Sequence, residues 1–258
     1  MGKIVAFSNQ KGGVGKTTTC VNMSAYLAQK GYKVLLVDFD PQGNATSGLG
    51  YAKSEVKTSV YNVIIDEVPT EQAVIKTKIE NLDILPATID LAAAEVELVY
   101  IKDREHALKK ALACAVPVYD FIMIDCPPSL GLLTINALSA ANTVLIPIQS
   151  EYYALEGLSQ LMNSIKLVAR HLNETLKVEG VVLTMGDKRA LIAKQISEEI
   201  RRFFGKSVYD TMIPRNIRLA EAPSHGVPIM LHDTKCAGAK AYLQLTEEFL
   251  SKQKNLKK

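Results

Sequence analysis

The sequence predicts an α/β fold, with a single doubly wound, mainly parallel sheet and helices on both faces. Short, continuous apolar runs alternate with longer stretches of helical spacing, which is the pattern of parallel strands buried on both sides. The chain has 258 residues, of which 48% are hydrophobic, so it can bury a sizeable core. No internal repeat or low-complexity linker divides it, and we expect one domain over residues 1–258.

The expected elements follow one another along the chain. Buried strands are predicted at Lys3–Ser8, Lys33–Asp38, Leu82–Pro86, Phe121–Asp125, Thr143–Ile148 and Gly180–Leu183. Helices are predicted near residues 15–30, 103–115, 131–141, 154–172 and 190–204, with Gly31 closing the first. Residues 41–80 begin with a polar stretch rich in Gly and Ser, and we expect them to form a mobile excursion from the core.

Composition argues against several classes of protein. No apolar run reaches the roughly 18 residues of a membrane-spanning helix, and the apolar stretch near Met1 is too short for a signal peptide. The cysteines are too far apart for a zinc knuckle or a C-x-x-C redox pair, and we expect buried, reduced thiols at Cys20, Cys114, Cys126 and Cys236. A cytoplasmic protein is the simplest interpretation.

The strongest functional signal is the glycine-rich turn between the first strand and the first helix. Such a turn lets backbone N–H groups point at phosphate oxygens, and the helix N-terminus adds positive potential. Lys16 can reach the β- and γ-phosphates, and the Thr17 hydroxyl can ligate Mg²⁺. The residues expected to bind the nucleotide here are Gly12, Gly13, Val14, Gly15, Lys16, Thr17 and Thr18.

Three carboxylates lie at the ends of predicted strands. Asp125 ends the most apolar strand, at the edge where open α/β sheets bind ligands, and it fits a direct or water-mediated Mg²⁺ ligand. Asp38 and Asp40 end the second strand and share one face of it. One of these two can face the loop lysine or the metal, and the other the attacking water.

The turn departs from the usual G-x-x-x-x-G-K-[ST] pattern, because Gln10 replaces the first glycine and Lys11 follows it. This K-G-G-x-G-K-[ST] form resembles that of the group containing ParA, MinD and the nitrogenase iron protein. Further stretches resemble blocks typical of chromosomal Soj-like ParA proteins: Val37–Thr46, Ile124–Gly131, Glu151–Gly157 and Ile213–Gly226. The chain therefore resembles the ParA/Soj family over nearly its whole length.

The resemblance implies an ATPase that uses ATP and Mg²⁺. In the family, ATP-bound subunits dimerise face to face, bind double-stranded DNA without sequence preference, and are released when a ParB/Spo0J-like protein stimulates hydrolysis. It implies that Lys11 contacts the partner's nucleotide and that Asp40 positions the attacking water. Asp38 is expected to support the P-loop threonines.

The resemblance also implies roles for residues far from the loop. Pro214 and Asn216 are expected to flank the adenine, and Glu151 to lie at the dimer interface. Arg189 and Arg218 match positions that contact DNA in the family. The resemblance thus implies a nucleoid-associated location. Residues 151–258 carry 17 Lys and Arg against 12 Asp and Glu, which favours a polyanionic partner, although a solvated basic surface is the alternative.

Other functions remain open at this point. A MinD-like ATPase that acts on the membrane surface needs an amphipathic C-terminal helix, whereas residues 251–258 contain only one apolar residue, Leu256. We therefore expect no stable membrane association. An iron–sulfur carrier would need suitably placed cysteines, and a metabolic P-loop enzyme would turn over rapidly without a protein or DNA partner.

Overall fold

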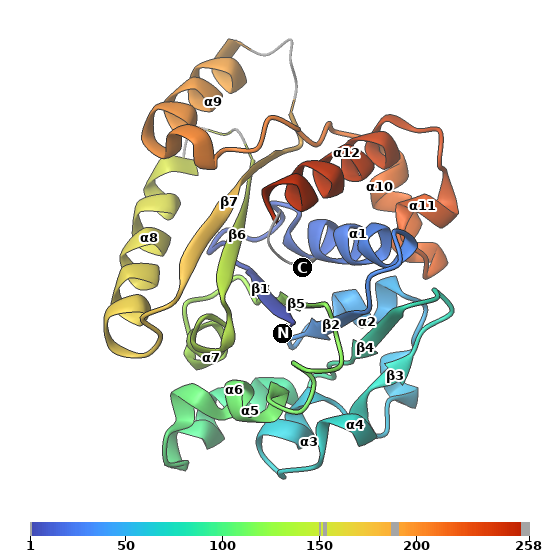
Figure 1. Ribbon diagram of the computed structural model, residues 1–258, viewed down its shortest axis with the longest axis vertical. Coiled ribbons are helices and arrows are strands. Elements are labelled where there is room, and N and C mark those ends of the chain that lie inside the picture. Colours follow the sequence, from blue (N-terminus) through green and yellow to red (C-terminus); the bar gives the residue numbers. More distant parts are fainter. Residues whose placement is uncertain (1, 150, 152–153, 187–190, 254–258) are drawn as a thin grey trace.

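The computed structural model describes residues 2–149, 151, 154–186 and 191–253. In this part of the chain a seven-stranded sheet has the order β3-β4-β2-β5-β1-β6-β7 (Figure 1). Its strands are β1 (Lys3–Phe7), β2 (Val34–Asp38), β3 (Ile75–Lys76), β4 (Leu82–Leu85), β5 (Phe121–Asp125), β6 (Thr143–Gln149) and β7 (Lys177–Thr184). All neighbours are parallel except β3 and β4, so the expected mainly parallel sheet is confirmed.

Helices cover both faces of the sheet (Figure 1). One face packs against α1 (Lys16–Gln29) and α12 (Ala237–Lys252), which lie side by side. The opposite face packs against α3 (Val60–Ile64), α5 (Leu91–Glu97), α6 (Ala107–Leu112), α7 (Leu132–Ala140) and α8 (Ala154–His171), and α9 (Leu191–Phe204) contributes to the same core. Successive residues of β1 alternate between the two cores, as Val5 and Ala6 do, because side chains of a strand point to opposite faces.

The strand register brings the predicted functional acids to one edge of the sheet. Phe7 of β1 pairs with Asp125 of β5, and Asp38 of β2 pairs with Asp125 from the other side. The turn after β1 therefore leaves the sheet directly beside both carboxylates, as expected for a ligand-binding edge of an open α/β sheet.

Short helices complete the chain. They are α2 (Asn44–Gly48), α4 (Thr70–Ala73), α10 (Ile217–Glu221), α11 (Ile229–His232) and the 3₁₀ turns Lys53–Glu55, Leu98–Tyr100, Arg104–His106, Gly205–Ser207 and Ala222–His225. The helices α2, α3 and α4 correct the expected excursion at residues 41–80, because Ala45 and Thr46 of α2, Val60 and Val63 of α3, and Ala73 of α4 are buried.

Other expectations also need correction. The helix predicted near residues 103–115 is a 3₁₀ turn followed by α6, which is short, and α12 was not predicted at all. None of the four cysteines is in a disulfide, but only Cys20 and Cys126 are buried, whereas Cys114 is exposed. Gly31 has a φ of +86° and closes α1 as predicted.

Candidate functional site

The glycine-rich turn connects β1 to α1 and is held by two residues that the sequence did not single out. The amide of Asn9 donates to the Pro147 carbonyl of β6 at 2.7 Å, and its oxygen accepts from the Lys11 N–H at 3.0 Å. The hydroxyl of Thr184, at the end of β7, donates to the Val14 carbonyl at 2.8 Å. Strands β6 and β7 therefore fix the two halves of the turn.

Two glycines of the turn have backbone conformations that other residues rarely adopt. Gly13 and Gly15 have φ values of +75° and +83°. Gly12 differs, because a Cβ built on it would meet none of the described atoms within 4 Å. Lys11, Gly12 and Gly13 are all exposed, so the outer side of the turn is open to a second molecule.

Lys16 lies at the start of α1 and is only 6% exposed. Its ammonium donates to the Lys11 carbonyl at 3.2 Å. Burial lowers the pKa of Lys16, and the charges of Asp125, Cys126 and Asp40 oppose this shift. A buried ammonium ringed by acidic groups, below a turn of exposed backbone, is suited to neutralise phosphate oxygens.

Asp125 is fully buried, and neither of its carboxylate oxygens has a hydrogen-bond partner among the described residues. Burial raises the pKa of Asp125, and the neighbouring charge of Asp38 adds to the rise. The Thr17 hydroxyl is near enough to oppose it, although the geometry is not that of a hydrogen bond. Burying a carboxylate without a hydrogen-bond partner destabilises the folded protein unless a cation binds it.

These residues fit Mg²⁺ in the presence of a nucleotide. Mg²⁺ is commonly held by one or two carboxylates together with phosphate oxygens and water. Among the described residues no group of three His, Cys, Asp or Glu could hold a metal by itself. Asp125 and Thr17 supply the kind of incomplete oxygen site that phosphate oxygens would finish.

Asp38 and Asp40 have different partners. Asp38 is fully buried, and its carboxylate accepts from the N–H and the hydroxyl of Thr46 in α2 at 2.7 and 2.6 Å. It therefore supports α2, which corrects the expectation that it supports the P-loop threonines. Burial raises the pKa of Asp38 to about 6. The Asp40 carboxylate accepts from the Gln42 N–H at 2.9 Å. Its charge raises the pKa of both Lys16 and Asp125.

A cavity of about 500 Å³ adjoins the turn, which is within the size range of small-molecule sites. Gly15 and Thr18 line it at the turn and the start of α1, and Pro214 and Asn216 line it on the segment that leads into α10. Both residues predicted to flank an adenine are thus brought to one cavity with the phosphate loop. Met185, Arg215 and Tyr242 also line this cavity, and sequence reasoning assigned none of them to it.

Lys11 and Glu151 form an ion pair at the mouth of the site. Their side chains are 42% and 47% exposed. The structure thus brings together these two residues, which were predicted to act at a dimer interface. Because Lys11 extends along the surface and Lys16 lies beneath the turn, the two lysines occupy different places.

The predicted DNA-binding arginines are only partly described. Arg189 lies outside the described residues. The Arg218 side chain is 53% exposed, and its guanidinium pairs with Glu221 at 2.8 Å and with Asp233 at 3.7 Å. Any anion that binds Arg218 therefore competes with two carboxylates.

The fold and this site define a P-loop nucleotide-binding protein with a second lysine in its phosphate loop. Residues 2–178 match the protein family described as AAA domain. The chain is 58% identical to the sporulation initiation inhibitor protein Soj of Bacillus subtilis, over 96% of this chain and 98% of that protein. It is 52% identical to the chromosome partitioning protein ParA of Myxococcus xanthus, over 98% and 89% of the two chains. The chain belongs to the ParA/Soj family of chromosome-partitioning ATPases.

Solved structures agree with this assignment of the fold. A Mycobacterium smegmatis structure named cobyrinic acid a,c-diamide synthase, with bound ADP and magnesium, has a TM-score of 0.87 at 36% identity and covers 99% of this chain and 96% of that one. The cell division ATPase MinD of Pyrococcus furiosus has a TM-score of 0.81 at 25% identity, over 97% and 99% of the two chains. Among the described residues, no helix combines the length and apolar character needed to cross a membrane.

Proposed function

We propose that residues 1–258 form one domain that acts as an ATP-driven switch in chromosome or plasmid partitioning. It hydrolyses ATP slowly, dimerises in the ATP state, binds double-stranded DNA without sequence preference, and responds to a ParB/Spo0J-like protein. This places it in the cytoplasm, on the nucleoid. The observation that carries the proposal is the exposed position of Lys11, which is separate from the buried phosphate site of Lys16.

The proposed catalytic roles follow from burial and charge. The Lys16 ammonium stabilises the negative charge that develops on the phosphates, and Thr17 and Asp125 hold Mg²⁺. Asp40 accepts a hydrogen bond from the attacking water and can also face the metal. Mg²⁺ supplies charge neutralisation between phosphate oxygens. Thr18 and the backbone of Gly12 to Gly15 bind phosphate, while Pro214 and Asn216 enclose the base.

Dimerisation gives Lys11 a new partner. In the single subunit this lysine is paired with Glu151 across an open surface. A partner's nucleotide would offer it a phosphate, and this differential contact is what lets ATP favour the dimer. Gly12→Val should bind ATP without dimerising, because the valine has space within its own subunit but projects toward the partner. Sedimentation with Mg²⁺ and ATP tests this expectation.

DNA binding is tested by gel retardation with ATP or ADP at two salt concentrations. The wild type is compared with Arg189→Glu/Arg218→Glu and with the matched control Lys102→Glu/Lys109→Glu, which makes the same charge change at exposed positions elsewhere. We expect ATP-dependent binding that weakens with salt, is lost in the arginine variant, and persists in the control.

Two other results would redirect the proposal. ATP-bound dimers that ignore DNA would indicate a switch acting on another surface, which anionic liposomes would then test. Rapid turnover without DNA or a protein partner would instead indicate a metabolic enzyme.

A further inference from the structure

Two glycines from distant parts of the chain meet beside the nucleotide site. Gly50 follows α2, and Gly226 follows the 3₁₀ turn Ala222–His225, with φ values of +87° and +65°. A Cβ on Gly226 would lie 2.6 Å from the Gly50 Cα, and a Cβ on Gly50 would lie 2.9 Å from the Gly226 carbonyl oxygen. The two backbones therefore touch so closely that neither position has room for a side chain.

The Gly50 side of this contact is attached to Asp40, the proposed catalytic acid, and to its neighbour Asp38. The Gly43 N–H donates to the Asp40 carbonyl at 2.8 Å, where α2 begins. Thr46, in the middle of α2, donates to the Asp38 carboxylate and accepts from the Ala87 N–H at 3.0 Å. Asp40 and Asp38 are therefore connected to Gly50 through one short helix. We call residues 40–50 the switch segment.

The Gly226 side is attached to the cavity and to Arg218. Asn216 lines the cavity and accepts from the Arg218 N–H at 2.9 Å, at the start of α10. Further on, the Ile229 N–H donates to the Asn22 side chain of α1 at 2.8 Å. We call residues 217–232 the arginine segment. It touches the switch segment at Gly226, and Figure 1 shows α10 and α11 on the same side of the molecule as α1.

A cavity of about 270 Å³ separates the two segments elsewhere. Asn44, Ser47 and Gly48 line it from α2, and Pro223 and Val227 line it from the arginine segment. Thr17 and Thr18 of the phosphate loop lie at the same cavity. This space gives α2 room to move relative to the arginine segment, while the glycine contact ties the far end of α2 to it.

We infer that the Gly50–Gly226 contact transmits the nucleotide state of the switch segment to the arginine segment, and so regulates the DNA-binding surface. This inference rests on the proposed function for its DNA consequence, but the transmission itself does not require DNA. Coupling the nucleotide site to the DNA-binding surface requires a structural element whose conformation depends on both. Here α2 is joined to Asp40 at its start and to Asp38 through Thr46, and Gly50, just after its end, contacts Gly226.

The test is Gly226→Ala, with Gly205→Ala as its matched control. Both glycines have positive φ, +65° and +53°, but a Cβ on Gly205 meets none of the described atoms within 4 Å. The control therefore carries the backbone strain without the collision. Gly50→Ala and Gly31→Ala form a second pair, with φ values of +87° and +86° and open space only at Gly31.

Hydrogen exchange is measured with Mg²⁺ and either ADP or a non-hydrolysable ATP analogue. In the wild type and both controls, we expect both segments to change by at least about fivefold between the two nucleotides. In Gly226→Ala and Gly50→Ala, only the switch segment should respond. The inference is overturned if the exchange of the arginine segment in the wild type does not depend on the nucleotide. It is also overturned if the arginine segment responds to the nucleotide in both contact variants as it does in the wild type.

DNA retardation then separates this inference from the proposed function. If the wild type binds DNA only with ATP, the contact variants should show a smaller difference in DNA affinity between ATP and ADP, whereas the controls should keep the wild-type difference. Unchanged ATP preference in both contact variants would overturn the inference. If the wild type binds no DNA, the proposed function fails, and the exchange measurement still decides whether the contact transmits the nucleotide state.

Discussion

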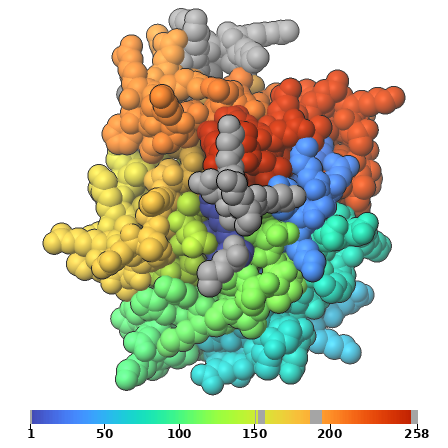
Figure 2. Space-filling view, in the orientation of Figure 1, coloured from blue at the N-terminus to red at the C-terminus, as the bar shows by residue number. Residues whose placement is uncertain are grey.

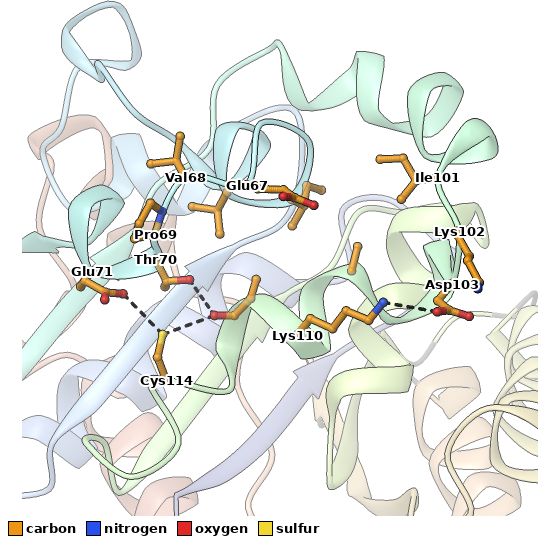
Figure 3. Close-up of a pocket in the computed structure, with 14 residues that line it drawn as sticks. Glu67, Val68, Pro69, Thr70, Glu71, Ile101, Lys102, Asp103, Lys110 and Cys114 are labelled. Atoms are coloured by element: carbon orange, nitrogen blue, oxygen red, sulfur yellow. Dashed lines mark hydrogen bonds and ion pairs between the residues drawn. The ribbon is translucent and has the colours of Figure 1, made fainter.

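Two cavities of this molecule differ in the hydrogen bonding of the polar groups in and beside them. The cavity beside the phosphate loop has about 500 Å³, and a second cavity of about 340 Å³ lies between the segment 63–71 and α6. Figure 3 shows that several polar groups of the second cavity pair with one another or with the backbone. Thr70 donates to the Ala111 carbonyl at 2.6 Å, and Lys110 pairs with Asp103 at 3.5 Å. We call it the paired cavity.

The phosphate-loop edge shows the reverse. Asp125 is fully buried with both oxygens unpartnered among the described residues, and Lys16 is buried with one long hydrogen bond. Buried polar groups are nearly always paired in folded proteins, and an unpaired carboxylate is the costliest exception. Asp125 is the carboxylate among the unpartnered buried groups of the described residues, and it lies beside the phosphate loop, where a ligand can complete it. Cavity size does not identify the phosphate site, whereas the unmet hydrogen-bonding capacity of Asp125 and the buried charge of Lys16 beside the phosphate loop do.

The largest effect expected from this comparison is at the two lysines. Lys16→Ala should weaken nucleotide binding by at least about 100-fold, because the ammonium is expected to bond both the β- and the γ-phosphate, and each hydrogen bond to a charged group contributes about 1.5–3 kcal/mol. Lys110→Ala, in the paired cavity, should leave the affinity unchanged. Titration with a fluorescent ATP analogue measures both. Equal affinity of Lys16→Ala and the wild type would remove the phosphate site from the proposal.

The next effect concerns catalysis and not binding. Asp40→Ala should bind ATP but hydrolyse it at least about 100-fold more slowly, because the attacking water loses its hydrogen-bond acceptor. The ATP-bound dimer should therefore be long-lived. Asp103→Ala is the matched control at a carboxylate of the paired cavity. Phosphate release and dimer lifetime are the measurements. Rapid hydrolysis by Asp40→Ala would contradict the catalytic assignment.

A smaller effect should appear in stability. Asp125→Asn should raise the Tm of the nucleotide-free protein by about 2–4 °C, since an amide is less costly to bury than an unpaired carboxylate. The variant should also lose the Tm increase that Mg²⁺ adds to nucleotide binding, which chelation by EDTA reverses in the wild type. Glu71→Gln, in the paired cavity, should show neither change. A lower Tm for Asp125→Asn without nucleotide would argue that Asp125 has a structural role.

The sequence predicted the parts of this site that are contiguous. The phosphate loop and the strand-end acids Asp38, Asp40 and Asp125 were found because each lies in a recognisable local pattern. Asn9 and Thr184 were missed, because their partners Pro147 and Val14 are brought near only by the fold. Asp38 was assigned the wrong threonines, since a sequence cannot rank Thr46 against those of the loop as hydrogen-bond donors.

The misread elements have different causes. Residues 41–80 looked mobile because α2 is built from small and polar residues, yet Thr46 and Gly48 are buried through backbone contacts and hydrogen bonds. The pattern of apolar residues in a sequence does not predict burial of this kind. In α12 the signal was present, because Ala239, Tyr242, Leu245 and Phe249 are buried at helical spacing. That helix could have been predicted.

The smallest expected effect tests whether the paired cavity is purely structural. Thr70 is buried, and its hydroxyl joins α4 to the Ala111 carbonyl of α6. Thr70→Val should destabilise the protein by about 1 kcal/mol, because the carbonyl loses its donor, whereas Thr70→Ser keeps the hydroxyl and should cost less. Neither should change the ATPase rate. Denaturant unfolding and phosphate release are measured on the same preparations. A slower ATPase in Thr70→Val, with a normal rate in Thr70→Ser, would show that the paired cavity affects ATP hydrolysis at the phosphate loop. Pairing of its polar groups would then not be enough to call a cavity purely structural.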